Sequence, residues 1–132
     1  MSEHSLWVSL RGLLPAGCHA SRIESHDTAS GFPDVHYTYQ EVSGTLELKE
    51  GKAPFKKKGL RKDQINWMAD ECEAGGIVWI VAQVGKTVYV VFGTYADRFN
   101  DLDEDGLDTY CAAKWKVGAY EPGILEGILR NT

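Results

Sequence analysis

Two short stretches decide the predicted fold of this chain: Gly31-Phe32-Pro33-Asp34 and Leu46-Glu47-Leu48-Lys49. In a β-strand, successive side chains point to opposite faces of the sheet. Glu47 and Lys49 are therefore expected on one face, while the leucines beside them point into a core. Pro33 restricts the backbone just before Asp34, and Gly31 permits a conformation that other residues resist. The sequence thus predicts an acid where one strand begins, and an acid and a lysine on the next strand.

The spacing of the two stretches indicates a β-hairpin. Asp34 lies 13 residues before Glu47. This separation suits an alternating strand over 35–39, a tight turn over 41–44 and a return strand over 44–50. Such a hairpin is expected to bring Asp34 and Glu47 together at one end.

Two carboxylates and an ammonium group on one face are costly unless something uses them. Converging like charges repel, and a hard divalent cation bound by oxygen ligands relieves that repulsion. Magnesium between Asp34 and Glu47 could generate a hydroxide and stabilise charge that develops on a phosphorus centre. Lys49 could orient the attacking water or neutralise a phosphate oxygen.

These residues resemble the signature of the PD-(D/E)xK nuclease superfamily, with Pro33-Asp34 followed by Glu47-Leu48-Lys49. A wider resemblance, over residues 21–92, is to the small phage and archaeal Holliday-junction resolvases and the VRR-NUC nucleases. It rests on Arg22-Ile23-Glu24, Ser30-Gly31-Phe32-Pro33-Asp34-Val35 and Leu60-Arg61-Lys62-Asp63-Gln64.

The resemblance implies an α/β fold with a central mixed β-sheet flanked by helices, as in restriction endonucleases. It also implies a Mg²⁺- or Mn²⁺-dependent endodeoxyribonuclease of DNA recombination and repair, acting as a homodimer on branched or junction DNA. The implied metal ligands are Glu24, Asp34, Glu47 and the backbone carbonyl of Leu48. The other implied catalytic residues are Lys49, which positions the water, and Gln64, which supports it. Without the resemblance, Glu24 would be a surface acid and Gln64 an ordinary exposed glutamine. The choice of junction DNA rests on analogy with the family.

A basic loop follows the predicted hairpin, although the whole chain has a net charge of −5. Residues 49–62 hold seven basic side chains against one acid, a local charge of +6. We expect this loop to contact the phosphate backbone of DNA; the simpler alternative is a solvated loop. The predicted nucleic-acid contacts are Lys52, Lys56, Lys57, Lys58, Arg61 and Lys62.

Length and composition are those of a single domain over residues 1–132, in which the resemblance implies a nuclease core at about 21–92. The N-terminal helix and the C-terminal extension are expected to pack on that core. Three widely spaced cysteines fit reduced thiols in a cytoplasm, which would be the bacterial host's if a phage encodes the chain. Neither a signal peptide nor an apolar run long enough to span a membrane is evident.

The remaining pattern is that of helices alternating with apolar strands. The two apolar strands should be covered on both faces, and a helix before the first makes a parallel crossover natural. Residues 18–24 are either the end of a helix or a short extended piece. The predicted helices cover 3–14, 60–74, 94–100 with Thr94 as cap, and 122–129; the two apolar strands cover 77–82 and 87–92.

Two rival interpretations remain open. A non-catalytic nucleic-acid- or protein-binding module could retain the nuclease fold. Alternatively, the segment 101–108 imitates the start of an EF-hand and suggests a calcium-regulated protein, but Ala112 stands where a bidentate glutamate is required. A solvated acidic turn is the simpler interpretation of that segment. Likewise, Trp115 and its flanking lysines could contact DNA or cover the core.

Overall fold

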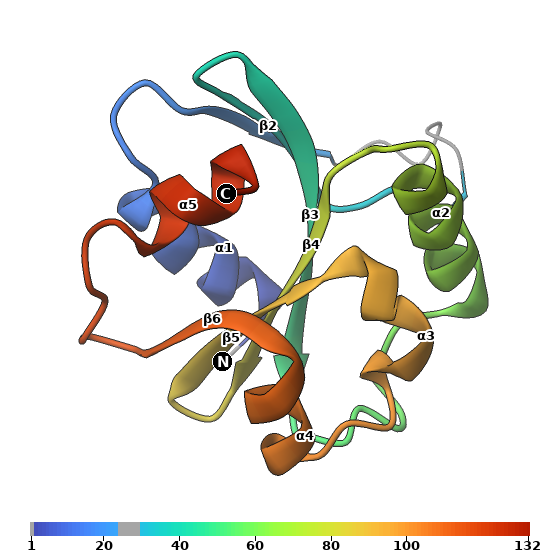
Figure 1. Cartoon of the computed structure of the whole chain (residues 1–132). Helices are drawn as coiled ribbons and strands as arrows, with labels where there is room; N and C mark the ends of the chain where they lie inside the picture. Colours follow the sequence, from blue (N-terminus) through green and yellow to red (C-terminus); the bar gives the residue numbers. More distant parts are fainter. Residues whose placement is uncertain (1, 24–29) are drawn as a thin grey trace.

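One six-stranded sheet forms the centre of the molecule in the computed structural model, which describes residues 2–23 and 30–132. The strands lie in their sequence order from β1 to β6 (Figure 1). The elements are α1 (Glu3–Leu13), β1 (His19–Arg22), β2 (Val35–Tyr39), β3 (Val42–Gly51), α2 (Lys62–Glu73), β4 (Val78–Val84), β5 (Thr87–Phe92), the 3₁₀ turn η1 (Gly93–Tyr95), α3 (Ala96–Phe99), α4 (Glu104–Tyr110), β6 (Cys111–Lys116) and α5 (Ile124–Arg130).

The sheet is mixed, as the sequence predicts. All neighbouring strands pair antiparallel except β3 and β4, which are parallel. A parallel pair needs a crossover connection, and α2 provides it. Each of the seven residues of β4 is buried, which confirms that this strand is covered on both faces. The α/β fold with a mixed sheet flanked by helices is therefore confirmed.

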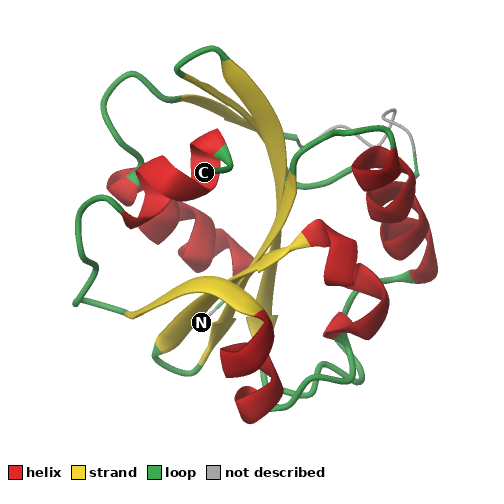
Figure 2. Cartoon of the chain, in the orientation of Figure 1, coloured by secondary structure: helices red, strands yellow, loops and turns green. Residues whose placement is uncertain are grey.

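Helices pack on both faces of the sheet, and a different set of helices covers each face (Figures 1 and 2). One face of β2, β3, β4 and β5 packs against α1 and α5 in a core that includes Leu6, Leu48 and Leu129. The opposite face packs against α2, α3 and α4 in a second core that includes Met68 and Phe99. Because the leucines of β3 belong to the first core, Glu47 and Lys49 lie on the face of the second.

Several local predictions differ from the structure. The β2–β3 turn centres on Gln40 and Glu41, both with positive φ, and not on residues 41–44. Two positive φ values match the twist of the paired strands, so the turn needs only two residues. Of the stretch 18–24, for which a helix end and an extended piece were both open, residues 19–22 form a strand.

The C-terminal third also needs correction. Thr94 lies inside η1 and does not cap the helix that follows. The acidic segment forms α4 rather than a turn, because the Asp103 side chain accepts a hydrogen bond of 2.8 Å from the backbone N–H of Gly106. Trp115 is 6% exposed and covers the core. The last helix begins after Gly123, so Pro122 lies outside it.

None of the helices described in the structure is long and apolar enough to span a membrane.

Candidate active site

The β2–β3 hairpin places Asp34 beside Glu47, as the spacing predicts. Val35 pairs with Leu46. Asp34, just before Val35, therefore lies near Glu47, just after Leu46, where β2 begins. The carboxylate of Asp34 accepts a hydrogen bond of 2.8 Å from the backbone N–H of Leu48. This bond ties the Asp34 side chain to β3, the strand that carries Glu47.

Glu47, Lys49 and Gln64 form one buried polar cluster with exposed fractions of 1%, 5% and 5%. Gln64 Nε2 donates a hydrogen bond of 3.0 Å to Glu47 Oε2. Lys49 Nζ donates one of 3.4 Å to Gln64 Oε1 and lies 3.6 Å from Glu47 Oε2. The amide therefore bridges the acid and the lysine, and Gln64 is not the exposed glutamine of the simpler interpretation.

The start of α2 fixes the position of Gln64. Its Oε1 also accepts a hydrogen bond of 2.9 Å from the backbone N–H of Arg61, the residue that precedes the helix. The first backbone N–H groups at a helix start lack partners within the helix, so this bond stabilises the N-terminal end of α2. Gln64 consequently has a structural role in the helix and a place in the polar cluster.

The loop before Asp34 packs directly on the same helix start. Gly31 has φ +84°, and a Cβ there would lie 2.2 Å from the carbonyl oxygen of Asp63. Ser30 Oγ donates a hydrogen bond of 2.7 Å to the Asp63 carboxylate. The Phe32 and Trp67 rings meet edge to face at 4.9 Å. Through these contacts the loop and α2 hold Asp34 and Gln64 in fixed relation.

The electrostatics of Glu47 are strongly perturbed. Burial, followed by the nearby charge of Asp34, raises the pKa of Glu47 to about 9, and the Lys49 charge only partly opposes this. Glu47 Oε1 is buried and has no hydrogen-bond partner among the described residues. A buried oxygen without a partner costs on the order of 1–3 kcal/mol, more for a charged group. The carboxyl group is therefore protonated at neutral pH, and its side-chain hydrogen bond with Asp34 also favours the protonated form.

Glu3, at the start of α1, is an acid that the sequence analysis did not assign to the site. Burial raises its pKa, Lys49 lowers it, and Asp34 raises it again, so its carboxylate lies within electrostatic range of both. The sequence indicates only an acid in the first turn of a helix, a position that the helix dipole favours in any protein. Only the packing of α1 against the sheet reveals its nearness to the site.

The third acid expected from the sequence, Glu24, lies outside the described residues. The preceding residue, Ile23, donates a backbone hydrogen bond of 2.6 Å to the carbonyl of Asp34. Within residues 2–23 and 30–132, no three His, Cys, Asp or Glu side chains gather closely enough to hold a metal ion. The described part of the cluster is thus the pair of Asp34 and Glu47, with Glu3 nearby.

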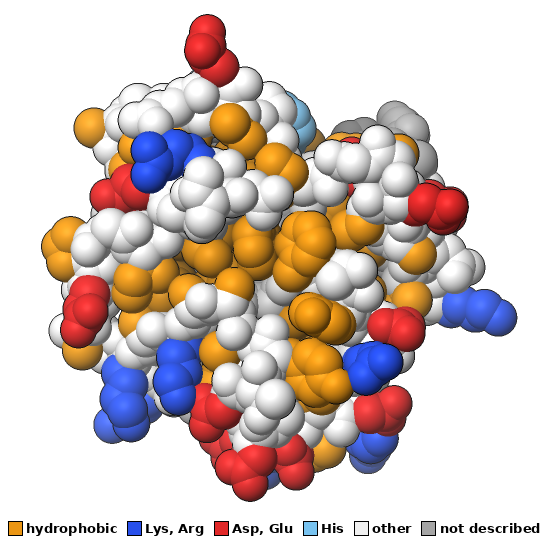
Figure 3. Space-filling model, in the orientation of Figure 1, with side chains coloured by type: hydrophobic (Ala, Val, Ile, Leu, Met, Phe, Trp, Pro, Cys, Tyr) orange, Lys and Arg blue, Asp and Glu red, His pale blue; other side chains and the backbone are white. Residues whose placement is uncertain are grey.

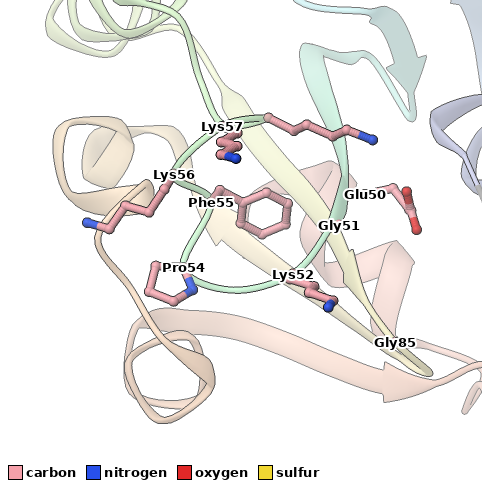
Figure 4. Close-up of a pocket in the computed structure, with 9 residues that line it drawn as sticks. Glu50, Gly51, Lys52, Pro54, Phe55, Lys56, Lys57 and Gly85 are labelled. Carbon is pink, nitrogen blue, oxygen red and sulfur yellow. The ribbon is translucent and has the colours of Figure 1, made fainter.

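The basic loop borders a hollow of about 700 Å³ at the far end of β3. Phe55 anchors this loop, because its ring is 2% exposed and stacks on Phe99 at 5.1 Å. Figure 4 shows Lys52, Lys56 and Lys57 directed away from one another around that ring. The predicted phosphate-binding side chains Lys52, Lys56, Lys57, Lys58, Arg61 and Lys62 are all exposed.

Two of these basic side chains already have acidic partners. Lys56 Nζ lies 2.7 Å from Asp101 Oδ1, and Arg61 Nε lies 3.2 Å from Asp63 Oδ1. The acidic segment 101–108 thus lies close to the basic loop in the folded chain. Lys56 would have to exchange Asp101 for a phosphate before it could bind DNA.

Replacing Lys56, Lys57 and Lys58 together by alanine is expected to weaken binding to every DNA sequence alike. The log–log salt slope should become shallower by about 0.9 for each phosphate contact that is lost. Binding titrations from low to moderate salt measure this slope, with Arg11→Ala as the control, since Arg11 is exposed on α1, across the sheet from the core that Phe55 joins. A triple variant with the wild-type slope would show that the loop is only solvated.

The fold defined by this mixed sheet and its helices occurs among nucleases. The Holliday junction resolvase Hjc of Archaeoglobus fulgidus, from an archaeal hyperthermophile, superposes with a TM-score of 0.55 and 18% sequence identity. The match covers 81% of this chain and 88% of that one. No family model and no curated protein matches the sequence. The likeness lies in the fold.

Proposed function

We propose that this protein is a metal-dependent DNA endonuclease of the PD-(D/E)xK type that hydrolyses phosphodiester bonds in branched DNA. One observation carries the proposal: a glutamate whose pKa is raised by burial and by a second carboxylate lies beside a buried lysine. Such a set destabilises the metal-free fold, and a cation between the acids would relieve it. The resemblance to a resolvase fold supports the choice of substrate.

The donor set fits a hard divalent cation, Mg²⁺ or Mn²⁺, which prefers carboxylate and carbonyl oxygens. Asp34 and Glu47 would hold it, together with the carbonyl of Leu48, and Glu24 or Glu3 would supply further negative charge. When bound, the metal lowers the pKa of a coordinated water and stabilises charge that develops on phosphate oxygens. Glu47 must lose its proton to serve as a ligand.

The protein's own contribution is positioning. Lys49 is held by Gln64 and Glu47, so its ammonium group lies beside Glu47 without help from substrate. There it would orient the attacking water and offset charge on a non-bridging phosphate oxygen. Gln64 would keep the lysine and the acid at constant separation.

Two cuts at a four-way junction require two sites, so we also propose a homodimer with two-fold symmetry. Light scattering on the purified protein, alone and with a junction, measures this state. A monomer in both cases would contradict the dimer.

The test of function is a panel of labelled DNAs, with magnesium and with EDTA: a four-way junction, a flap, a nicked duplex and a plain duplex. We expect cleavage of the junction in magnesium and none in EDTA or with Asp34→Asn. Binding without cleavage under every condition would instead identify a non-catalytic module. Equal cleavage by the variant and the wild type would mean that Asp34 takes no part.

Glu3→Gln is expected to raise the magnesium concentration needed for half-maximal cleavage, because it removes a negative charge within electrostatic range of the site. An effect of about tenfold, equivalent to about 1.4 kcal/mol, is reasonable for one neighbouring charge. Glu41→Gln, at the exposed tip of the hairpin, is the matched control. Parallel titration of Glu24→Gln shows which acid acts, and an unchanged midpoint for Glu3→Gln would exclude Glu3.

A further inference from the structure

The face of the sheet that carries Glu47 and Lys49 changes character at β3. On β4 and β5 this face is apolar and lies under α2, α3 and α4. On β1, β2 and the first half of β3 it is polar, and none of the helices in the described structure lies over it. The β2–β3 hairpin extends beyond the end of α2 in Figure 1. Figure 3 shows histidine atoms at the surface between that hairpin and α2.

Strand register identifies the side chains of this surface. In β1, His19 and Ser21 pair with Thr38 and His36 of β2, which pair in turn with Ser43 and Thr45 of β3. The alternation that places Glu47 on this face places all six there, while Val35 and Tyr37 point to the opposite core. We call this the polar face; its members are His19, Ser21, His36, Thr38, Ser43 and Thr45.

We propose that the polar face seats the sugar–phosphate backbone of the DNA arm next to the cut site. The inference rests on the proposed nuclease function and adds a second contact surface, on the other side of the site from the basic loop. Its first support is continuity, since residues 43, 45, 47 and 49 lie in one row along β3. At about 3.3 Å per residue, Ser43 lies about 13 Å from Glu47, the length of about four base pairs.

The second support is chemical. Each of the six side chains is a hydroxyl or an imidazole, and His19, Ser21, His36 and Ser43 are exposed. Serine and threonine hydroxyls are common partners of phosphate and sugar oxygens, and such contacts fix the register of DNA without reading its sequence. Among the described residues of these strands, no acid lies on this face before Glu47 itself, although the chain is acidic overall. A surface without long side chains suits a backbone better than the base edges in a groove.

The third support is that the exposed members of this face are not needed by the fold. Thr45 is the exception, since it is 5% exposed and its hydroxyl donates a hydrogen bond of 3.4 Å to the backbone carbonyl of Ile77. Thr38 and Ser43 share a hydrogen bond of 2.8 Å, but its atoms are exposed to solvent. The opposite face of the same strands is apolar and covered, so the hairpin is anchored from behind. Apart from Thr45, the polar face is therefore open to a partner as far as residues 2–23 and 30–132 are concerned.

Ser43 offers a charge test in both directions. Ser43→Lys should tighten binding to a four-way junction and steepen the log–log salt slope by about 0.9. Ser43→Glu should weaken binding by about fivefold or more, since two charges 4 Å apart in water interact by about 1 kcal/mol. Ser9→Lys and Ser9→Glu are the matched controls, because Ser9 is an exposed serine on α1, which covers the opposite face.

Dissociation constants measured in EDTA, together with single-turnover cleavage at saturating DNA in magnesium, give the readout. We expect the Ser43 variants to change binding and to leave the saturated cleavage rate unchanged. If both match their Ser9 controls while the wild type binds and cleaves, the polar face is not a DNA seat and the nuclease proposal stands. If the wild type neither binds nor cleaves any DNA, the nuclease proposal falls, and this inference falls with it.

Discussion

Glu47→Gln is expected to abolish cleavage and, at alkaline pH without metal, to make the protein more stable than the wild type. The amide keeps the shape of the carboxyl group and can still accept the hydrogen bond from Gln64. It has no charge to offer a cation and cannot acquire one. The fold should therefore survive a change that removes the proposed metal ligand.

The stability effect follows from the direction of the pKa shift. The pKa of Glu47 is about 9 in the folded protein and about 4.3 in an unfolded chain, so between these values the folded state binds the extra proton. Stability is then greatest at low pH and falls as pH rises toward 9. The slope approaches about 1.4 kcal/mol per pH unit for one proton, within the range where only the folded state is protonated. Glutamine removes this loss.

Thermal unfolding in EDTA at several pH values between 5 and about 9 tests the expectation. Wild-type stability should decline over this range relative to Glu47→Gln, and magnesium should restore the wild type alone. Glu50→Gln, at the next acid along the same strand, is the control and should behave like the wild type. Parallel pH profiles for the wild type and Glu47→Gln would show that the acid is not buried in its protonated form.

Lys49→Ala is expected to cleave at least about a hundredfold more slowly while it binds DNA almost normally. A preorganised charge acts mainly on the transition state, so its loss affects turnover more than affinity. Lys49 is also only 5% exposed, which limits its contribution to the first encounter with DNA. Loss of the exposed lysines in the basic loop is instead expected to weaken DNA binding.

Lys49→Arg separates geometry from charge. A planar guanidinium group cannot take the compact position of an ammonium group 3.4 Å from Gln64 Oε1 and 3.6 Å from Glu47 Oε2. We expect incomplete rescue in single-turnover cleavage, measured beside a binding titration for both variants. Full activity of Lys49→Arg, or a binding loss as large as the cleavage loss in Lys49→Ala, would identify Lys49 as a phosphate anchor.

Much of this site was predictable because its information is local. Because Glu47 and Lys49 alternate with leucines, the sequence predicts that both lie on the same face of the strand. The 13-residue spacing from Asp34 to Glu47 predicts the hairpin that brings the two acids together. Gln64 was suggested by the family resemblance, but its bond to the backbone of Arg61 depends on how α2 begins. The turn position was mistaken because Gln40 and Glu41 are not typical residues for positive φ.

The remainder depends on contacts between distant segments. Glu3 comes within electrostatic range of Lys49 and Asp34 because α1 packs on β3, and nothing in residues 3–14 predicts that nearness. The ion pair between Lys56 and Asp101 joins the basic loop to the acidic segment, and the sequence does not predict this contact because the two segments are far apart along the chain. The helical form of the acidic segment depends on a single cap at Asp103, which competes with the turn that the aspartates also favour.

Gly31 has a consequence for how this protein would tolerate random mutation. Any side chain there must displace the backbone of Asp63, so the loop and α2 would have to part. Asp34 would then move with the loop and Gln64 with the helix. In a screen of mutant libraries, residue 31 would behave like an active-site position although it carries no functional group. Activity lost there should return through second-site changes that reseat α2, whereas no change elsewhere in the chain would replace a missing Glu47.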